Sequence, residues 1–139
     1  ELKDQLPTRQ VMKFVSKIAL IREFPAGYAL SYGRTYITKR KTRAAYIPVG
    51  YADGYPRALS NKGSVLIHGK RCDIIGRVCM DWFLVDITDN DHMQVNDEVI
   101  LLGESTGDCI SADEIAEIAE TIPYEILCKI SRRVTRTYE

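Results

Sequence analysis

Turn-forming residues divide this sequence at short intervals, and that spacing constrains the fold more than any other feature. The segments Pro25-Ala26-Gly27, 50–63, His68-Gly69-Lys70 and 88–91 are rich in Gly, Pro, Asp or Asn and break the chain. The stretches between them are short and mostly alternate apolar with polar side chains, which is typical of β-strands. Strands are predicted at residues 11–23, 28–38, 44–49, 64–67, 71–75, 78–88, 98–102 and 134–138.

Three of these predicted strands carry more specific expectations. Pro48 cannot donate a ladder hydrogen bond, so the strand at 44–49 is expected at a sheet edge or with a bulge. Gly103 is expected to end the buried strand at 98–102. The alternation in residues 11–23 is expected to place four apolar side chains on one face, namely Met12, Phe14, Ile18 and Leu20.

Helical signals occur only near the C-terminus of the sequence. Ser111 followed by Glu114 forms a capping box, which predicts a helix that starts there. Pro123 ends that helix and is well placed to start a second short one through Cys128. The apolar face of the first helix is expected to contain Ile115, Ile118 and Ala119. Solvated surface charges are expected at Arg132, Arg133 and Arg136.

The size and composition fit one globular domain. The chain has 139 residues, of which 45% are hydrophobic and 27% charged, so it can bury a core without a metal or disulfide. Nineteen basic residues balance nineteen acidic ones, which argues against a nucleic-acid-binding surface. No apolar stretch approaches the ~18 residues of a membrane span. The regular strand spacing favours a closed or sandwich-like β domain.

The cysteines and histidines exclude several kinds of site. The four cysteines include no Cys-x-x-Cys pair, and they are expected to be reduced thiols in a cytoplasmic protein. His68 and His92 are the only histidines and lie far apart in the sequence, so neither a metal site nor a Ser-His-Asp triad is indicated. The sequence also lacks a glycine-rich phosphate-binding loop.

Four short motifs carry more information than the composition. They are SYGRTY at residues 31–36, GYADGYPR at 50–57, GRVCMD at 76–81, and IPYEILC at 122–128 followed by SRRV at 131–134. Each is short, but the four occur in order and at comparable spacing. Together they resemble the C-terminal domain of the alanine racemase family, over nearly the whole chain from residue 11 to residue 138.

The resemblance implies an isomerase that uses pyridoxal 5'-phosphate to interconvert L-alanine and D-alanine for cell-wall peptidoglycan. In that family an N-terminal (β/α)8 barrel holds the cofactor on a lysine. The C-terminal domain is then a closed or partly closed Greek-key-like β barrel with one or two short helices near its C-terminus. Two chains pair head to tail as a homodimer, so each active site is shared between subunits. Residues 1–10 are then a linker from the missing barrel, and residues 11–139 the C-terminal domain.

The resemblance also implies roles for five residues and no metal. Tyr32 matches the catalytic tyrosine, one of two opposed acid/base groups that work on opposite faces of the substrate α-carbon. Met80 matches the position whose backbone N–H binds the substrate carboxylate. Tyr51 and Arg77 match residues that line the narrow substrate entry, and Tyr124 matches a tyrosine near the cofactor phosphate.

The sequence departs from the family pattern in two respects. Pro123 stands where the family often has Asn, so a small shift of the backbone before Tyr124 is expected. None of the eight lysines lies in the Val-Val-Lys-Ala-Asn-Ala-Tyr-Gly setting that the family uses for the cofactor. The isolated chain is therefore predicted to be inactive and not to bind the cofactor tightly.

Three alternatives remain open at this point. A serine racemase of the vancomycin-resistance type resembles the same family but tends to carry Asn at the position of Tyr124. A non-catalytic β module that dimerises or binds a partner would have little need for the Tyr32 hydroxyl. An oligonucleotide-binding barrel would need a basic stripe with exposed aromatic side chains, which the balanced charge does not favour.

Overall fold

The computed structural model describes residues 11–138, which form a mainly-β domain with two short helices. The strands are β1 Phe14–Lys17, β2 Leu20–Phe24, β3 Ala29–Leu30, β4 Tyr36–Ile37, β5 Thr42–Ile47, β6 Ser64–Ile67, β7 Lys70–Asp73, β8 Phe83–Asp86, β9 Glu98–Ser105 and β10 Asp108–Ile110, and the helices are α1 Ala112–Ile118 and α2 Pro123–Lys129. The predicted linker, residues 1–10, lies outside the described residues.

Two antiparallel sheets form the body of the domain. One has the strand order β1-β9-β6-β7, with β10 paired to β9, and the other has the order β2-β5-β8. The sheets are joined on one side because the chain runs directly from β1 into β2, and on the other by a single bridge between Ile74 and Val85. The mainly-β prediction is confirmed, but no closed barrel is found among residues 11–138.

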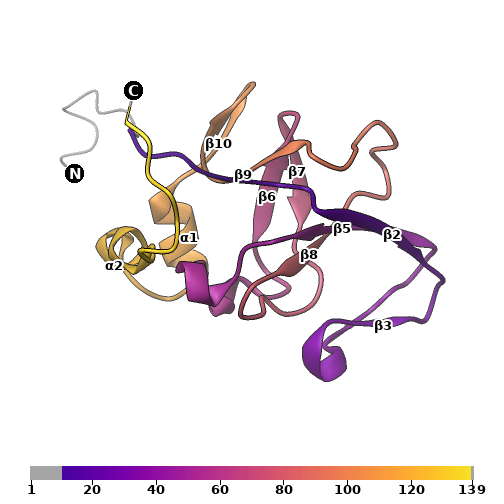
Figure 1. Ribbon diagram of the computed structural model, residues 1–139. Coiled ribbons are helices and arrows are strands. Elements are labelled where there is room, and N and C mark those ends of the chain that lie inside the picture. The colour runs from indigo at the N-terminus through magenta and orange to yellow at the C-terminus, as the bar shows by residue number, and fades with distance from the viewer. Residues whose placement is uncertain (1–10, 139) are drawn as a thin grey trace.

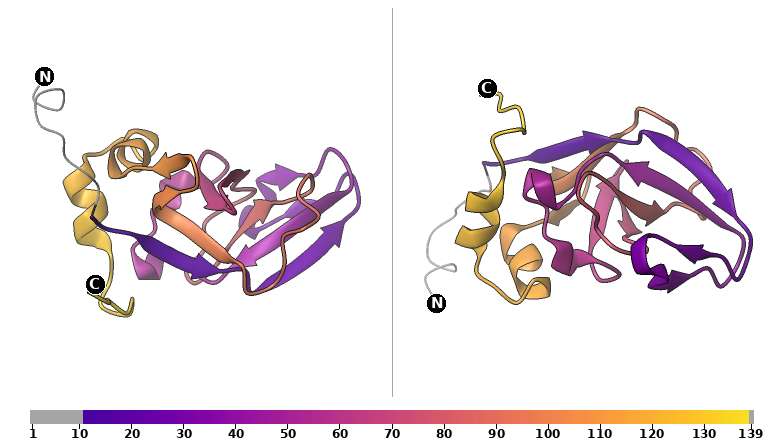
Figure 2. Two further views of the ribbon diagram at one scale, coloured as in Figure 1. Left: turned by 90° about the horizontal axis from the view of Figure 1, so that it is seen from above. Right: turned by 60° about the horizontal axis from the view of Figure 1, so that its bottom comes forward.

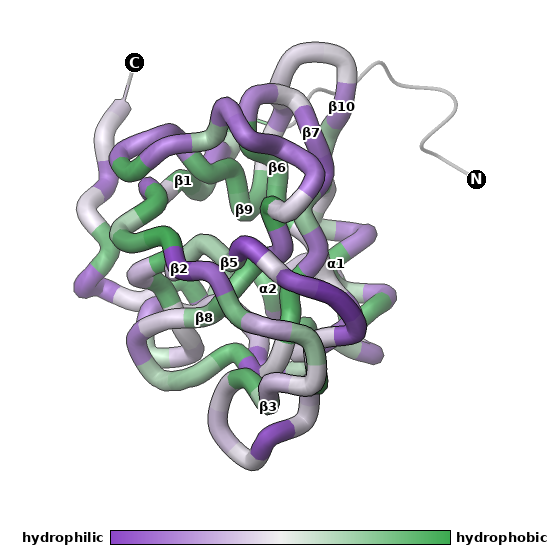
Figure 3. Tube along the Cα trace, turned by 90° about the vertical axis from the view of Figure 1, so that its right-hand side faces the viewer, coloured by the Kyte–Doolittle hydropathy of each residue, from purple (hydrophilic) through white to green (hydrophobic). Residues whose placement is uncertain are grey.

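The hydrophobic core has two parts. The main part lies between the sheets and against α1 and α2, and it includes the apolar side chains of β6 and β9, which Figure 3 shows as adjacent hydrophobic segments. A smaller cluster lies on the other face of the β2-β5-β8 sheet and contains Phe24, Leu30, Ala44, Ile75 and Leu84. The β3-β4 hairpin contributes Leu30 and the half-buried Tyr36 to this smaller cluster, so the hairpin covers part of that face.

The helices and the β3-β4 hairpin occupy opposite ends of the molecule. Figures 1 and 2 show α1 and α2 together at one end and the hairpin at the other. Side chains carried by the hairpin and by α2 therefore lie on separate surfaces. No helix among residues 11–138 is both long and apolar enough to cross a membrane.

The predicted strand at 11–23 is two strands that belong to different sheets. The Ile18 N–H donates to Asp97 O, whereas the Ala19 N–H donates to Tyr46 O, so the chain changes partner between these residues. The expected single apolar face therefore ends at Ile18. Leu20 is 40% exposed whereas Phe14 and Ile18 are buried, so the prediction that Leu20 shares their face was wrong.

Two other predicted strands are interrupted by turns. Residues 28–38 form the β3-β4 hairpin because Ser31, Gly33 and Arg34 have positive φ angles that reverse the chain. Only Phe83–Asp86 of the predicted strand 78–88 is extended, since the Cys79 N–H donates to Trp82 O and closes a turn before it.

Three further expectations about strands were wrong. β5 pairs on both sides without a bulge, because its ladder ends at Ile47 and Pro48 lies just beyond it. β9 continues through Gly103 to Ser105, where it pairs with β10. Residues 134–138 form no strand. The hairpin of β6 and β7 around His68-Gly69 is confirmed.

Both predicted helices are confirmed. Ser111 Oγ accepts a hydrogen bond from the Glu114 N–H at 3.1 Å, as expected for an N-cap. The Glu114 carboxylate, however, is hydrogen bonded to Arg71. Ile115 is buried in the main core, with Ile118 and Ala119 packed against that core, and Pro123 occupies the first turn of α2.

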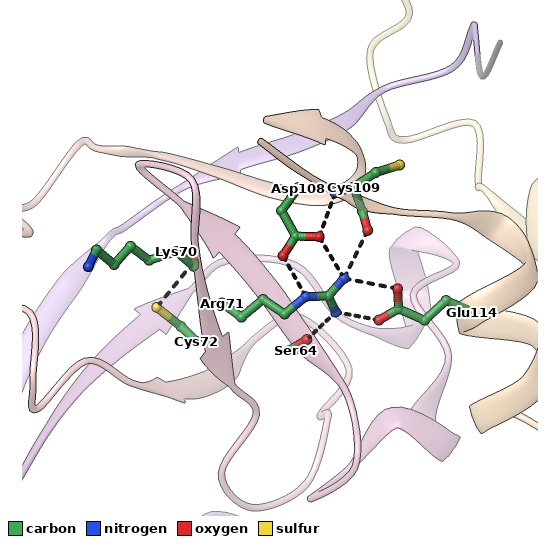
Figure 4. A network of polar contacts seen from close by, with 7 residues as sticks. All are labelled: Ser64, Lys70, Arg71, Cys72, Asp108, Cys109 and Glu114. Atoms are coloured by element: carbon green, nitrogen blue, oxygen red, sulfur yellow. Dashed lines mark hydrogen bonds and ion pairs between the residues drawn. The ribbon is translucent and has the colours of Figure 1, made fainter. Parts of the chain in front are cut away.

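The Arg71 guanidinium connects α1 to the strands (Figure 4). It donates to both Asp108 oxygens at 2.7 and 3.1 Å and to both Glu114 oxygens at 2.6 and 3.2 Å. It also donates to Ser64 Oγ and to the Cys109 carbonyl. Two bidentate carboxylate pairs on one guanidinium form a network and not an isolated surface pair.

We expect Arg71→Met to lower the free energy of unfolding by about 1–2 kcal/mol, since the network is partly exposed. Hydrogen bonding to Arg71 holds the pKa of Asp108 below its ordinary value of 3.8. That stabilisation is present above about pH 4 and is lost as the pH falls through the lowered pKa. Urea denaturation from pH 7 to pH 2 should therefore show that the free energy of unfolding depends less on acid pH in the variant.

Lys41→Met, which breaks the exposed pair with Glu23, is the control and should change little. Equal effects of the two substitutions would contradict the role of the network.

Candidate active site

Four of the five predicted site residues line one open hollow of about 370 Å³. Three segments of chain form this hollow: the tip of the β3-β4 hairpin, the loop after β5 and the loop before β8. Its lining includes Tyr32, Tyr51, Arg57, Arg77, Met80 and Trp82, together with Val78, Cys79 and Asp81. Aromatic rings, a thioether and guanidinium groups therefore meet in one place, although they come from distant parts of the sequence.

Tyr32 is presented by a strained turn at the hairpin tip. Its side chain is 77% exposed, in a 3₁₀ turn over Tyr32–Arg34. Ser31, on one side, has φ 63° and ψ 175°, and Gly33 and Arg34, on the other, have φ 74° and 52°. The Ser31 conformation belongs to a region that is essentially restricted to glycine and costs about 1–3 kcal/mol for other residues. Its persistence therefore requires compensating contacts.

Ser31 has those contacts with the loop before β8. Its hydroxyl donates to Arg77 O at 3.0 Å and accepts from the Arg77 N–H at 2.9 Å. Gly76 makes this approach possible, because a Cβ atom there would lie 2.4 Å from Ser31 Cβ. The hairpin tip and the Arg77 backbone are thus held together directly.

The loop after β5 lies against the backbone of Met80. The Tyr51 N–H donates to Cys79 O and the Ala52 N–H to Met80 O, both at 3.0 Å. A Cβ atom on Gly50 would lie 2.2 Å from Cys79 O, so only glycine permits this approach. The peptide bonds of the described residues are trans, and the N–H and C=O of a trans peptide point in opposite directions. Because Cys79 O points to Tyr51, the Met80 N–H points away from that loop.

An ion-pair network connects the same loops to the C-terminal segment through Arg133. The Arg133 guanidinium lies 2.9 Å from Asp53 Oδ1 and 2.7 Å from Asp81 Oδ1. The second Asp53 oxygen accepts from the Gly50 N–H at 2.9 Å. Hydrogen bonding to Asp81 holds the pKa of Arg133 above its ordinary value. Arg133 is an exposed surface charge, as predicted, but it is not isolated, because the fold brings two distant carboxylates to it.

Arg77 has a buried nitrogen without a partner. Its Nε is buried and has no hydrogen-bond partner among the described residues. A Cβ atom on Gly33 would lie 3.3 Å from this nitrogen, so the guanidinium rests against the hairpin tip. The hollow thus contains cationic groups, but the described residues that line it include no lysine that could hold an aldehyde cofactor.

Tyr124 lies outside this hollow. It is 76% exposed in the first turn of α2, at the other end of the molecule from the β3-β4 hairpin (Figure 1). Its side chain is therefore not part of the surface that Tyr32 lines. Tyr55, a neighbour of Tyr51 in the same motif, is buried against Phe83, and burial raises its pKa far above the ordinary value.

Sequence reasoning missed several residues of this site. Ser31, Arg57 and Trp82 were not assigned, although the first two lie inside recognised motifs. The motif pattern could have indicated Ser31 and Arg57, whereas the pairing of Arg133 with Asp53 and Asp81 has no sequence signal. Among residues 11–138, no group of three or more His, Cys, Asp or Glu side chains is arranged to hold a metal ion.

The fold and the hollow define a class: a mainly-β domain that presents tyrosine and arginine side chains on an open surface. A family model described as the alanine racemase C-terminal domain matches residues 11–138. The chain belongs to this family. It is 48% identical to the alanine racemase of Halothermothrix orenii over 139 residues, which is all of this chain and 37% of that protein. It is 50% identical to alanine racemase 2 of Caldanaerobacter subterraneus over 133 residues, which is 96% of this chain and 34% of that protein.

Solved structures show the same relationship. The alanine racemase of Clostridium difficile in complex with cycloserine superimposes with a TM-score of 0.87 and 45% identity, covering 95% of this chain and 34% of that one. The Bartonella henselae enzyme with covalently bound pyridoxal phosphate gives 0.88 and 36%, covering 96% of this chain and 37% of that one. The chain thus spans about a third of the length of the relatives that it matches.

We expect Gly50→Ala to push the loop after β5 away from Met80, because the new Cβ would meet two backbone carbonyls and not a flexible side chain. The free energy of unfolding should fall by roughly 1–3 kcal/mol, and the NMR signal of the Met80 methyl group should shift. Gly27→Ala is the control: Gly27 has φ +79° and open space around it, so only backbone strain of about 1 kcal/mol is expected. An unshifted Met80 signal in Gly50→Ala would contradict the close approach.

Proposed function

We propose that this chain is the C-terminal domain of a pyridoxal-phosphate-dependent racemase that interconverts L-alanine and D-alanine. The observation that carries the proposal is the presentation of Tyr32, whose exposed phenol stands at the rim of a hollow with Met80 and Arg77. Family membership and the names of the relatives support it. In this proposal the protein acts in the cytoplasm and supplies D-alanine for the cell wall.

Racemisation explains why an exposed phenol would be needed. The reaction removes a proton from one face of the α-carbon and returns one to the opposite face, so two acid/base groups must flank the substrate. Tyr32 Oη supplies one of them and holds or moves the proton on its own face. Pyridoxal phosphate, when bound, delocalises the negative charge left on the α-carbon. Since the described lining of the hollow has no lysine, the lysine for the cofactor belongs to another part of the full-length protein.

The remaining residues of the hollow orient and select the substrate. The Met80 N–H, which points away from the loop after β5, binds the substrate carboxylate. Tyr51 and Arg77 line the entry, and their size favours a small amino acid. A homodimer with head-to-tail pairing brings this hollow to the partner's barrel. Tyr124, on the separate surface of α2, then contacts cofactor phosphate held by the barrel of its own chain.

Two alternative functions remain testable. A serine racemase would use the same hollow, but Tyr124 favours alanine over the Asn-bearing relatives. A non-catalytic dimerisation or binding module would not need the strained turn that presents Tyr32, because strain of this kind is retained mainly at functional sites. The first of the following two experiments separates these possibilities, and the second tests whether this chain is inactive by itself.

In the full-length protein with cofactor added, Tyr32→Phe should reduce alanine racemisation by at least about 100-fold, because the proton on one face loses its acceptor. Optical rotation with L-alanine and with L-serine measures the racemisation rate of each amino acid and shows which one is the better substrate. Tyr28→Phe is the matched control, since Tyr28 lies outside the hollow and its ring packs against Phe24 in a tilted arrangement. Full activity of Tyr32→Phe would show that the site is assigned wrongly, and no turnover of either amino acid would favour the non-catalytic module.

The 139-residue chain alone should neither racemise alanine nor bind pyridoxal phosphate tightly, because its hollow offers no lysine. A cofactor titration followed by absorbance should show no saturable complex at micromolar concentration, and optical rotation should stay constant. Measurable turnover by this chain would contradict the proposal that the cofactor lysine belongs to another part of the full-length protein.

A further inference from the structure

Ser31 combines a costly backbone conformation with two hydrogen bonds from its hydroxyl to the Arg77 backbone. Its φ and ψ angles, 63° and 175°, are those that glycine adopts readily and other residues avoid. A glycine would suit this backbone better, but it would lack the hydroxyl that bonds to both the N–H and the C=O of Arg77. The strained backbone at Ser31 is therefore accompanied by two hydrogen bonds that a glycine could not make.

The contact between Ser31 and Arg77 fixes the backbone position of Tyr32, the next residue. Tyr32 is 77% exposed, and no hydrogen bond to its side chain appears among the contacts of the described residues. Its position therefore depends on its backbone, which is held on one side by Ser31. On the other side the Asn61 side chain donates to Thr35 Oγ1 at 3.2 Å and accepts from the Gly76 N–H at 2.6 Å. Both ties connect the hairpin tip to residues 76–77.

We propose that Ser31 is a positioning residue for Tyr32: its hydroxyl locks the hairpin tip to the Arg77 backbone and so sets where the Tyr32 phenol stands over the hollow. The proposal rests on the proposed racemase function, in which Tyr32 moves a proton. A misplacement of about 1 Å can cost about 100-fold in rate, so a lock of this kind matters to proton transfer more than to folding.

Two substitutions in the full-length protein separate position from stability. Ser31→Gly removes the hydroxyl and the strain together, whereas Ser31→Ala removes the hydroxyl and keeps the strain. Both should lower kcat by about 10- to 100-fold with KM within about twofold of wild type. The melting temperature should be higher for Ser31→Gly than for Ser31→Ala. Activity that follows the melting temperatures would indicate a merely structural role and overturn the proposal.

A double-mutant cycle tests whether Ser31 acts through Tyr32. In a Tyr32→Phe background, Ser31→Gly should cause no further loss of activity, while a further loss equal to that in the wild type would overturn the proposal. With α-deuterated L- and D-alanine, the isotope effect of Ser31→Gly should rise only for the enantiomer whose α-hydrogen Tyr32 removes. An unchanged isotope effect for both enantiomers would also count against it.

Hydrogen exchange gives a readout that does not depend on activity. Ser31→Gly should speed amide exchange in residues 32–36 of the full-length protein without affecting β6 or β9. Asn96→Gly is the matched control, since Asn96 also has a positive φ, 76°, but lies outside the hollow; it should change neither activity nor exchange at 32–36. Unchanged amide exchange in Ser31→Gly would overturn the proposal that the Ser31 hydroxyl holds the hairpin tip.

A wild-type protein that racemises neither amino acid overturns the proposed function, and the exchange result then decides separately whether Ser31 holds Tyr32.

Discussion

The close approach of three loops through backbone contacts is the constraint on which the hollow depends. Gly50 lies against the carbonyls of Cys79 and Met80, and Gly76 leaves room for Ser31. Backbone groups pack this closely only where side chains are absent. Arg133 then holds the loops through its carboxylate partners. The backbone beneath the side chains of the hollow therefore has few alternative positions.

The small hydrophobic cluster links stability to this site. Because the β3-β4 hairpin covers part of one face of the β2-β5-β8 sheet through Leu30 and Tyr36, the element that carries Tyr32 is anchored by apolar burial at its base. Only its tip is strained and exposed. Rigid support beneath a strained tip is the arrangement expected where a side chain must be presented to a partner surface. The Arg71 network stabilises the opposite end, around α1.

Much of the site could be predicted from the sequence, because four motifs contain Tyr32, Tyr51, Arg77, Met80 and Tyr124 in order. The structure brings the first four together in one hollow and places Tyr124 elsewhere. The strands were predicted less well where the chain changes sheets. Alternation shows which face a side chain occupies only while the hydrogen-bonding partner stays the same. At Ile18 and Ala19 that partner changes from Asp97, next to β9, to Tyr46 of β5.

The sequence by itself determined the mainly-β class, the two C-terminal helices and the hairpin at His68-Gly69, because turn residues and capping residues act on their immediate neighbours. Only the tertiary structure decided that Ile18 pairs with Asp97 while Ala19 pairs with Tyr46 of the other sheet, and that Ser31 meets Arg77. The physical reason is distance along the chain. Such contacts join segments that are separated by many residues, and their energies depend on where the whole fold places each backbone group.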